Sequence, residues 1–360
     1  MSFQTTIVNK GSSDFDLSSN AYTDPSIPLF SQSGLQDVRL VQSSHPVQAR
    51  LDQDGNGKGV LQIQMNLRRE QTLTLEVQYL ASVYHTQQRE LWQSRSFDVA
   101  DSGTVAEIPR AFVDSYCRAA GPWRLNESGA SWRRILDLTS QLIEGESNVL
   151  AIIVKLVDWV GKNIKYPRDT RDHILLPDET LAHLEGDCDE QSNLLITMLR
   201  YARVPAYLQT GALYLPSRDR RSTLLNGHLV ASMNSIGWHA WAMVYAPPWG
   251  WLPVDMTIGY RQESPLDAIT YSAPATLTAI IANSIMTSDY ISEGNAAASE
   301  LQKTGIEIIE SQSIEQVVAP RAEDIVPILI TVSVLVFFGI TILATYFVAR
   351  ARRRARSLSN

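Results

Sequence analysis

Alternating polar and apolar residues mark the first part of the chain as β structure. Runs such as LQIQMNL (61–67) and TLTLEVQYL (72–80) place apolar side chains at every second position, which is typical of strands with one buried face. They predict a small antiparallel β domain over residues 36–110. Residues 1–35 are rich in Ser, Asn, Asp and Pro without a clear period, so we expect a flexible N-terminal segment.

One loop in this region has the spacing of a calcium site. In DQDGNGKG (52–59), Asp52, Asp54 and Asn56 match the opening of a calcium-binding loop, but Ile63 stands where the closing carboxylate should be. The Asp-Gly and Asn-Gly pairs are equally typical of hairpin turns. We therefore expect a β-hairpin here and no metal site.

Further along, the apolar period changes from two residues to that of a helix. Helical patterns cover 132–142 and 148–164, and strand-like runs follow between 206 and 260. Helices followed by clustered strands predict an α+β domain over residues 125–265. We expect residues 266–324 to form a helical extension and a polar stalk.

The end of the chain carries the signature of a membrane anchor. Residues 325–349 form a run of 25 without one charge, which is long enough to cross a hydrocarbon core of about 30 Å. They predict a single transmembrane helix in contact with the lipid bilayer, followed by a basic tail over 350–360. The five arginines of that tail favour a cytoplasmic tail and an extracytoplasmic domain. The polar first 40 residues show no export signal, so the sidedness stays open.

Charge and cysteine content narrow the classes of function. The net charge of -7 and the pI of about 5.4 argue against nucleic acid as a partner, because no basic stripe could neutralise phosphates. Cys117 and Cys188 lie far apart, so neither a disulfide framework nor a zinc site is indicated. The oligomeric state is not indicated.

Cys188 has a setting that suits a reactive thiol. Asp187 and Glu190 have the spacing of a capping box, which puts Cys188 at the first position of a helix. The positive end of a helix lowers a thiol pKa, whereas Asp187, Asp189 and Glu190 raise it. The helix alone therefore does not activate the thiol, and a base is needed.

His239 and Asp255 supply a candidate base and its partner. In a hairpin centred on Pro247 the two residues would lie directly opposite each other on adjacent strands, with Trp241 on the same face. A thiol, an imidazole and a carboxylate together make up a nucleophilic triad. Each of the three alone has an ordinary structural explanation, as a buried thiol, a core histidine or a turn cap.

Three segments resemble the transglutaminase-like superfamily, which has a papain-like fold. They are KLVDWVGKNIKY (155–166), GDCDEQSNLLITMLRYARVPAY (186–207) and WHAWAMVYAPPWGWLPVDMT (238–257). Together they span roughly residues 130–260, about a third of the chain. The chain looks like a membrane-anchored member of the microbial type, with an N-terminal β domain added before the core.

The resemblance implies a role for each candidate residue. Cys188 would be the nucleophile, His239 the general base and acid, and Asp255 the carboxylate that orients the histidine. The implied reaction is acyl transfer from a protein or peptide amide through a thioester, with water or an amine as acceptor. No cofactor, metal or calcium requirement is implied.

Other parts of the site are less well defined by motif. We expect Trp238, Trp241 and Tyr166 to line the substrate groove. The backbone N–H of Cys188 and a polar group near Tyr166 are candidate oxyanion donors.

The sequence departs from the family pattern at three positions. Arg203 stands where the family has a glycine that ends the helix in a left-handed conformation, so we expect either local strain of about 1 kcal/mol or a different cap there. Met256 replaces a proline, and Met243 replaces a frequent acidic residue. None of these positions is part of the triad.

Two other classes of function remain possible on the sequence. A non-catalytic peptide-binding or scaffold protein would keep the transglutaminase-like fold without the chemistry. A tail-anchored cytoplasmic adaptor would use the β domain as its working part.

Overall fold

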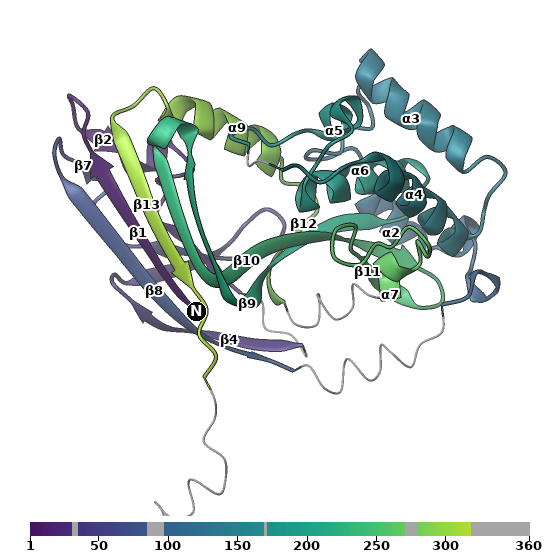
Figure 1. The fold of residues 1–360 in the computed structure, drawn as a ribbon, viewed down its shortest axis with the longest axis horizontal. Coiled ribbons are helices and arrows are strands. Elements are labelled where there is room, and N and C mark those ends of the chain that lie inside the picture. Colours follow the sequence, from purple (N-terminus) through teal and green to yellow (C-terminus); the bar gives the residue numbers. More distant parts are fainter. Residues whose placement is uncertain (31–34, 85–96, 169–170, 271–278, 318–360) are drawn as a thin grey trace, which may run out of the picture. The chain divides into compact units, whose positions relative to one another are not determined.

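One eight-stranded sheet runs through the described chain in the order β12-β9-β10-β13-β1-β8-β4, with β11 paired to β10 (Figure 1). The computed structural model describes residues 1–317 apart from 31–34, 85–96, 169–170 and 271–278. The strands are β1 Ser2–Asn9, β4 Gln36–Ser43, β8 Thr72–Val83, β9 Ala206–Leu224, β10 Leu229–Ala246, β11 Gly250–Val254, β12 Ile280–Ile285 and β13 Ile306–Ser313.

Two smaller sheets accompany the large one. Their pairing orders are β3-β6-β5 and β2-β7. The strands are β2 Phe15–Asp16, β3 Ser26–Leu29, β5 Val47–Leu51, β6 Gly57–Leu61 and β7 Asn66–Leu67.

Most of the helices gather at the end of the sheet where β10 pairs with β11 (Figure 1). The α-helices are α2 Arg110–Tyr116, α3 Ala130–Leu142, α4 Val149–Asn163, α5 Pro177–His183, α6 Cys188–Tyr201, α7 Asp267–Thr270 and α9 Tyr290–Leu301. The 3-10 helices are η1 Leu17–Ser19, η2 Val99–Asp101, η3 Val105–Glu107 and η4 Leu225–Gly227.

The two helical patterns seen in the sequence are confirmed as α3 and α4. Asn148 caps α4 by accepting a hydrogen bond from the Ala151 N–H at 3.0 Å. Apolar residues of α4, α6, β10 and β11 form one buried cluster. The α+β arrangement expected for this region is therefore present, and its core lies between the helices and one face of β10.

The expected hairpin at residues 52–59 is also confirmed. β5 and β6 pair antiparallel, with Leu51 opposite Gly57. Inside the turn, the Asp52 carboxylate accepts from the N–H groups of Asp54 and Asn56 at 2.9 and 2.8 Å. The Asp52 side chain thus stabilises the turn itself.

The Asp54 side chain binds this hairpin to residues 286–288, which are distant in the sequence. Its carboxylate accepts hydrogen bonds from the backbone N–H groups of Met286, Thr287 and Ser288 at 2.9 to 3.1 Å. These three residues lead into α9. The tip of the β5–β6 hairpin therefore helps to fix where α9 begins.

The flexible segment expected over residues 1–35 is wrong for the described residues, because β1, β2, η1 and β3 lie within it. Ser2–Asn9 form β1, which pairs with β13 on one side and β8 on the other. Ile7 of this strand is buried in a second apolar cluster, which also contains Leu229 and Ile306. The alternation in this short strand is hidden by the surrounding polar residues, and its partners lie far away in the sequence.

Of the helical extension and polar stalk expected at 266–324, helices are present as α7 and α9, but the described residues do not form a stalk. α9 and β13 lie in this range, and β13 pairs with β1 and with β10. Met1–Ile314 form one compact unit, so the β region and the α+β region share a sheet rather than forming separate domains.

The predicted transmembrane span at 325–349 and the tail at 350–360 lie outside the described residues. Within the described part of the chain, no helix is both long enough and apolar enough to cross a membrane.

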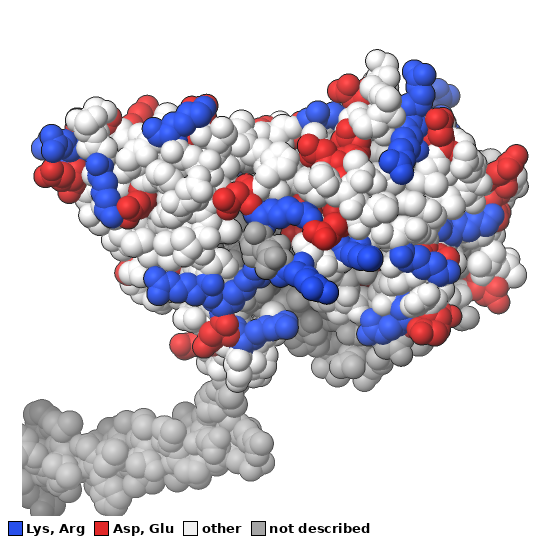
Figure 2. Space-filling view, turned by 45° about the horizontal axis from the view of Figure 1, so that its top comes forward, with Lys and Arg blue, Asp and Glu red and all other residues white. Residues whose placement is uncertain are grey.

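Charges of both signs are interspersed on the surface. On the face shown in Figure 2, described Lys and Arg side chains lie among Asp and Glu side chains. This mixture agrees with the modest net charge of -7.

Arg203 adopts the left-handed conformation that the family pattern indicated, with φ of 63°. Its N–H donates to the Arg200 carbonyl at 3.0 Å, and the Val204 N–H donates to the Leu199 carbonyl at 2.9 Å. These two bonds are the Schellman arrangement that ends many helices, usually at a glycine. Of the two alternatives expected here, the structure shows the left-handed helix end at Arg203 rather than a different cap.

Replacing Arg203 by glycine should therefore raise the free energy of unfolding by about 1 kcal/mol, because glycine adopts this φ without steric cost. The measurement is urea unfolding of both proteins. Arg203→Ala is the matched control, since it removes the charge but keeps the Cβ and should bring no such gain. Equal stabilisation by alanine and glycine would show that the arginine charge, not the backbone, limits stability here.

Candidate active site

Cys188 begins α6, as the capping pattern predicted. The Asp187 N–H donates to the Glu190 carboxylate at 2.9 Å. The other oxygen of Glu190 accepts the Leu175 N–H at 2.8 Å. Glu190 therefore holds the start of the helix and the preceding segment together, and fixes the backbone on which the thiol stands.

The helix behind Cys188 is enclosed by the protein. All residues from Glu190 to Arg200 are buried. The Gln191 Nε2 donates to the Gly186 carbonyl at 2.7 Å, and the Ser192 Oγ donates to the Cys188 carbonyl at 2.6 Å. Because the helix is enclosed, its backbone is held in place, and this limits the movement of the Cys188 side chain.

His239 and Asp255 are hydrogen-bonded in the interior. The distance between His239 Nε2 and the nearer Asp255 oxygen is 2.6 Å. Asp255 is fully buried and His239 is 6% exposed. The structure thus brings together the two residues that the sequence had paired.

The strand register that brings His239 and Asp255 together differs from the expected register. Ala242 lies opposite Val254 and Ala246 opposite Gly250, so the hairpin is centred on Pro248 rather than on Pro247. Continued by one step, this register puts residue 241, not 239, opposite Asp255. A shift of two keeps both side chains on one face of the sheet, and diagonal neighbours remain within reach of long side chains.

Asp255 is held on both of its oxygens. Its second oxygen accepts the N–H groups of Thr257 and Ile258 at 3.0 and 2.9 Å. Burial alone would raise the pKa of Asp255, but the hydrogen bond and charge of His239, together with these N–H groups, lower it below its usual value. Asp255 is therefore a carboxylate at neutral pH.

The environment of the Cys188 thiol opposes ionisation. Burial, followed by the charges of Asp189 and Asp187, raises the pKa of Cys188 well above its usual value, and Asp255 adds to this. A hydrogen bond from the Ala240 backbone N–H acts in the opposite direction. Ala240 is the residue next to His239 on β10.

A network that the sequence did not reveal lies on the other side of Cys188. The Tyr290 hydroxyl donates to Asp189 at 2.8 Å and accepts from the Asn193 Nδ2 at 2.6 Å. Burial, then the neighbouring Asp187, raises the pKa of Asp189 well above its usual value. Tyr290 is 101 residues away from Asp189 in the sequence, so no local pattern could have indicated the contact.

The acidic residues beside Cys188 also form a possible ligand set. Among the residues that the structure describes, Asp187, Cys188 and Asp189 are the group whose potential metal-binding atoms lie within 4.8 Å of one another. Carboxylates next to a thiol offer mixed hard and soft ligands. Nothing else in the site indicates a metal.

A cleft of about 430 Å³ lies in front of His239. Of the expected groove residues, Trp238 and Tyr166 line this cleft. Trp241 does not line it, because its side chain is fully buried and packs against the His239 ring at 5.7 Å between centroids. The remaining lining residues are Gly161, Ile164, Gln191, Leu213, Leu215, Arg218, Gly237, Met256, Thr257 and Ile258.

Tyr166 lies close enough to the thiol for their charges to interact. Burial, followed by the charges of Cys188 and Asp187, raises the pKa of Tyr166 to about 12. Its hydroxyl therefore keeps its proton at neutral pH. It can donate a hydrogen bond to a group bound near Cys188.

A family comparison covers the three triad candidates of this site. Residues 136–256 match the family model of the transglutaminase-like superfamily. The matched stretch contains Cys188, His239 and Asp255, and it confirms the resemblance that the three sequence segments indicated. This part of the chain has a transglutaminase-like α+β fold.

Individual relatives are more distant. The uncharacterized Bacillus subtilis protein YebA is 25% identical over 140 residues, which are 36% of this chain and 18% of YebA, so the chain matches less than a fifth of that protein. A candidate cysteine protease from Cytophaga hutchinsonii is similar in structure, with a TM-score of 0.44 and 13% identity over 86% of this chain and 85% of the other. The periplasmic domain of TgpA from Pseudomonas aeruginosa has a TM-score of 0.31 and 13% identity over 77% of this chain and 74% of its own.

The reactivity of Cys188 should depend on His239. A thiol whose pKa is raised stays protonated at neutral pH, unless a neighbouring imidazole accepts its proton and the two form an ion pair. We expect iodoacetamide to alkylate Cys188 at about pH 7, below the ordinary thiol pKa of about 8.5. In His239→Ala, alkylation should require pH above that value.

Two comparisons make this measurement specific. Burial raises the pKa of Cys117 to about 12, so Cys117 serves as an internal unreactive thiol. His183→Ala removes an exposed histidine at the end of α5 and should leave the profile unchanged. If His239→Ala also leaves it unchanged, the histidine does not act on the thiol.

Proposed function

We propose that this chain is a cysteine-dependent acyl-transfer enzyme that acts on protein or peptide amides through a thioester at Cys188. The observation that supports it most is the buried hydrogen bond of 2.6 Å between His239 and Asp255, next to a cysteine at the start of a buried helix. The transglutaminase-like match of residues 136–256 supports the same chemistry.

In this proposal each member of the triad has one task. Asp255, a carboxylate with both oxygens occupied, binds His239 through Nε2 and leaves Nδ1 to exchange a proton with the thiol. Because burial and the nearby acids disfavour an isolated thiolate, the thiolate forms together with an imidazolium. Asp255 stabilises that imidazolium and holds the ring in position.

The reaction then follows in two halves. The Cys188 sulfur attacks the amide carbonyl carbon, the C–N bond breaks, and His239 gives its proton to the leaving amine, so that a thioester remains. In the second half His239 takes a proton from water or from a primary amine as that acceptor attacks the thioester. The C–S bond breaks, and a carboxylic acid or a new amide is released.

The developing negative charge on the carbonyl oxygen needs hydrogen-bond donors. The backbone N–H of Cys188 is at the first position of α6, where helical N–H groups lack partners within the helix. The protonated Tyr166 hydroxyl, which lines the cleft in front of His239, is a second donor. Both are proposed to bind the oxyanion.

A non-catalytic peptide-binding role is the alternative, and one observation favours it. The pKa of Cys188 is raised by its own surroundings, as for an inert buried thiol. The cleft beside His239 would then bind extended peptides without reaction.

An activated acyl donor distinguishes the two roles. With p-nitrophenyl acetate we expect a rapid burst of one equivalent of p-nitrophenolate and acetylation of Cys188, located by peptide mass spectrometry. Cys188→Ala should lose the burst, and His239→Ala should slow it by about 10²–10⁴-fold. Adding a primary amine then shows whether the acyl group goes to the amine or to water.

Cys117→Ala is the matched control for this assay and should keep the full burst. A burst that survives in Cys188→Ala would place the reactive group elsewhere. Binding of peptides without any burst would instead support the non-catalytic role.

We further propose that residues 325–349 anchor the enzyme in a membrane as a single helix, with the folded unit on the extracytoplasmic side. The support is the length of the uncharged run and the arginines that follow it. The substrates would then be proteins or peptides near the membrane surface.

Protease treatment of intact cells tests this location. We expect added protease to digest the folded unit and to spare an epitope tag placed after residue 360, because the tail is expected in the cytoplasm. Permeabilised cells, in which both should be digested, are the control. Protection of the folded unit in intact cells would place it in the cytoplasm.

A further inference from the structure

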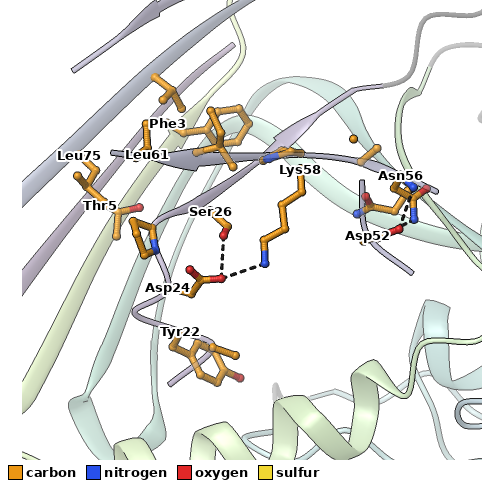
Figure 3. Close-up of a pocket in the computed structure, with 18 of the residues that line it drawn as sticks. Phe3, Thr5, Tyr22, Asp24, Ser26, Asp52, Asn56, Lys58, Leu61 and Leu75 are labelled. Carbon is orange, nitrogen blue, oxygen red and sulfur yellow. Dashed lines mark hydrogen bonds and ion pairs between the residues drawn. The ribbon is translucent and has the colours of Figure 1, made fainter. Parts of the chain in front are cut away.

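A second cavity, of about 570 Å³, lies between the small β3-β6-β5 sheet and the large sheet (Figure 3). Its volume is in the range of small-molecule sites. Apolar residues such as Phe3, Leu61 and Leu75 line part of it, and polar residues such as Tyr22 and Asn56 line the rest. No role in the proposed reaction requires this space.

The charge of the cavity is predominantly negative. Among the described lining residues there are four acids, Asp24, Asp52, Asp54 and Glu310, and a single cation, Lys58. Lys58 already pairs with Asp24 at 2.9 Å (Figure 3). The cavity therefore presents an excess of negative charge to any ligand.

Not all of these acids are available to a ligand. The Asp52 carboxylate binds the turn of its own hairpin, and the Asp54 carboxylate binds the N–H groups that lead into α9. Glu310 is different, because its hydrogen bond comes from a neutral amide, the Gln312 Nε2 at 3.2 Å. Burial raises the pKa of Glu310, as expected for a half-buried carboxylate that pairs with no cation among the described residues.

An aromatic side chain lines the same cavity as this carboxylate, since Tyr22 and Glu310 are both lining residues. Burial, followed by the charge of Glu310, raises the pKa of Tyr22. Aromatic faces beside a carboxylate are the usual surroundings of bound ammonium and guanidinium groups.

The cavity and the cleft in front of His239 have one lining residue in common. Trp238, which precedes His239, lines both spaces. Its Nε1 donates to the Gln312 Oε1 at 2.7 Å, and Gln312 in turn binds Glu310. On another side of the cavity is Tyr290, whose hydroxyl binds Asp189 beside Cys188.

The spacing of the acids does not suit a metal ion. Within the part of the chain that the structure describes, the three-residue group compact enough to chelate a metal is the one around Cys188. The acids of the cavity are spread over its walls. Such a distribution fits a longer organic cation better than a single ion.

We propose that this cavity binds an ammonium or guanidinium group on an apolar stem, with Glu310 as its counter-ion and Trp238 and Tyr22 as aromatic walls. Such a group is either the Lys or Arg side chain of a peptide that continues from the catalytic cleft, or a free amine. The first source rests on the proposed function, whereas binding of the cation itself does not.

Calorimetry on the full-length chain carrying Cys188→Ala tests the proposal without any chemistry. The probes are Nα-acetyl-lysine amide, Nα-acetyl-norleucine amide, which has the stem without the charge, and n-butylamine, which has the charge without the backbone. We expect the lysine probe to bind about tenfold or more tightly than the norleucine probe. Glu310→Gln should abolish that difference.

Two further variants guard against indirect effects. Glu307→Gln removes the same charge from the same strand, at a residue that pairs with Lys10 outside the cavity, and should keep the preference. Ala282→Phe places a large side chain in the cavity wall and should weaken binding of the lysine probe. Unchanged circular dichroism in each variant shows that the fold is intact.

The outcomes separate the two sources and the two proposals. Tight binding of n-butylamine identifies a free amine as the ligand, and binding of the lysine probe alone identifies a substrate side chain. Equal binding of the lysine and norleucine probes, or no effect of Glu310→Gln, overturns the inference. Failure of the acetylation burst at Cys188 would overturn the proposed function and leave these binding results standing.

Discussion

The long strand β10 is the element on which the rest of the structure depends. Its first part, from Leu229 to Asn234, pairs in parallel with β13, and its last part, from Ala242 to Ala246, pairs with β11. Along nearly its whole length it also pairs with β9. Trp238 and His239 lie between these two parts, so the hydrogen bonding of a single strand places the catalytic candidate next to the second cavity.

Much of the site could be predicted because its determinants are local. A capping pair beside Cys188 specifies where α6 begins, and alternation along β10 specifies which face carries His239. The predicted register of the β10–β11 hairpin differs by two residues from the observed one. The turn type, not the hydrophobic pattern, sets this register. A shift of two residues keeps His239 and Asp255 on the same face of the sheet. The two side chains therefore form the expected hydrogen bond.

The parts that sequence reasoning missed depend on contacts between distant residues. β1 and β13 look like ordinary polar segments, yet Thr5 lies opposite Glu310 in the sheet. Tyr290 reaches Asp189 from the start of α9. Trp241 was expected in the groove as an aromatic residue near the histidine. It lies instead on a central strand, where its side chain is buried in the core. No window of sequence contains both members of such pairs.

The position of β1 also has a consequence for how the chain folds. This strand, from the beginning of the chain, lies between β8 and β13, and β13 ends at Ser313. During synthesis β1 can pair with β8 early, but its other edge stays open until some 300 residues have followed. Pairings of such large sequence separation fold slowly, and an open strand edge invites pairing with other chains. The nascent protein therefore exposes an unpaired edge for most of its synthesis and closes it only when β13, the last of the described strands, is added.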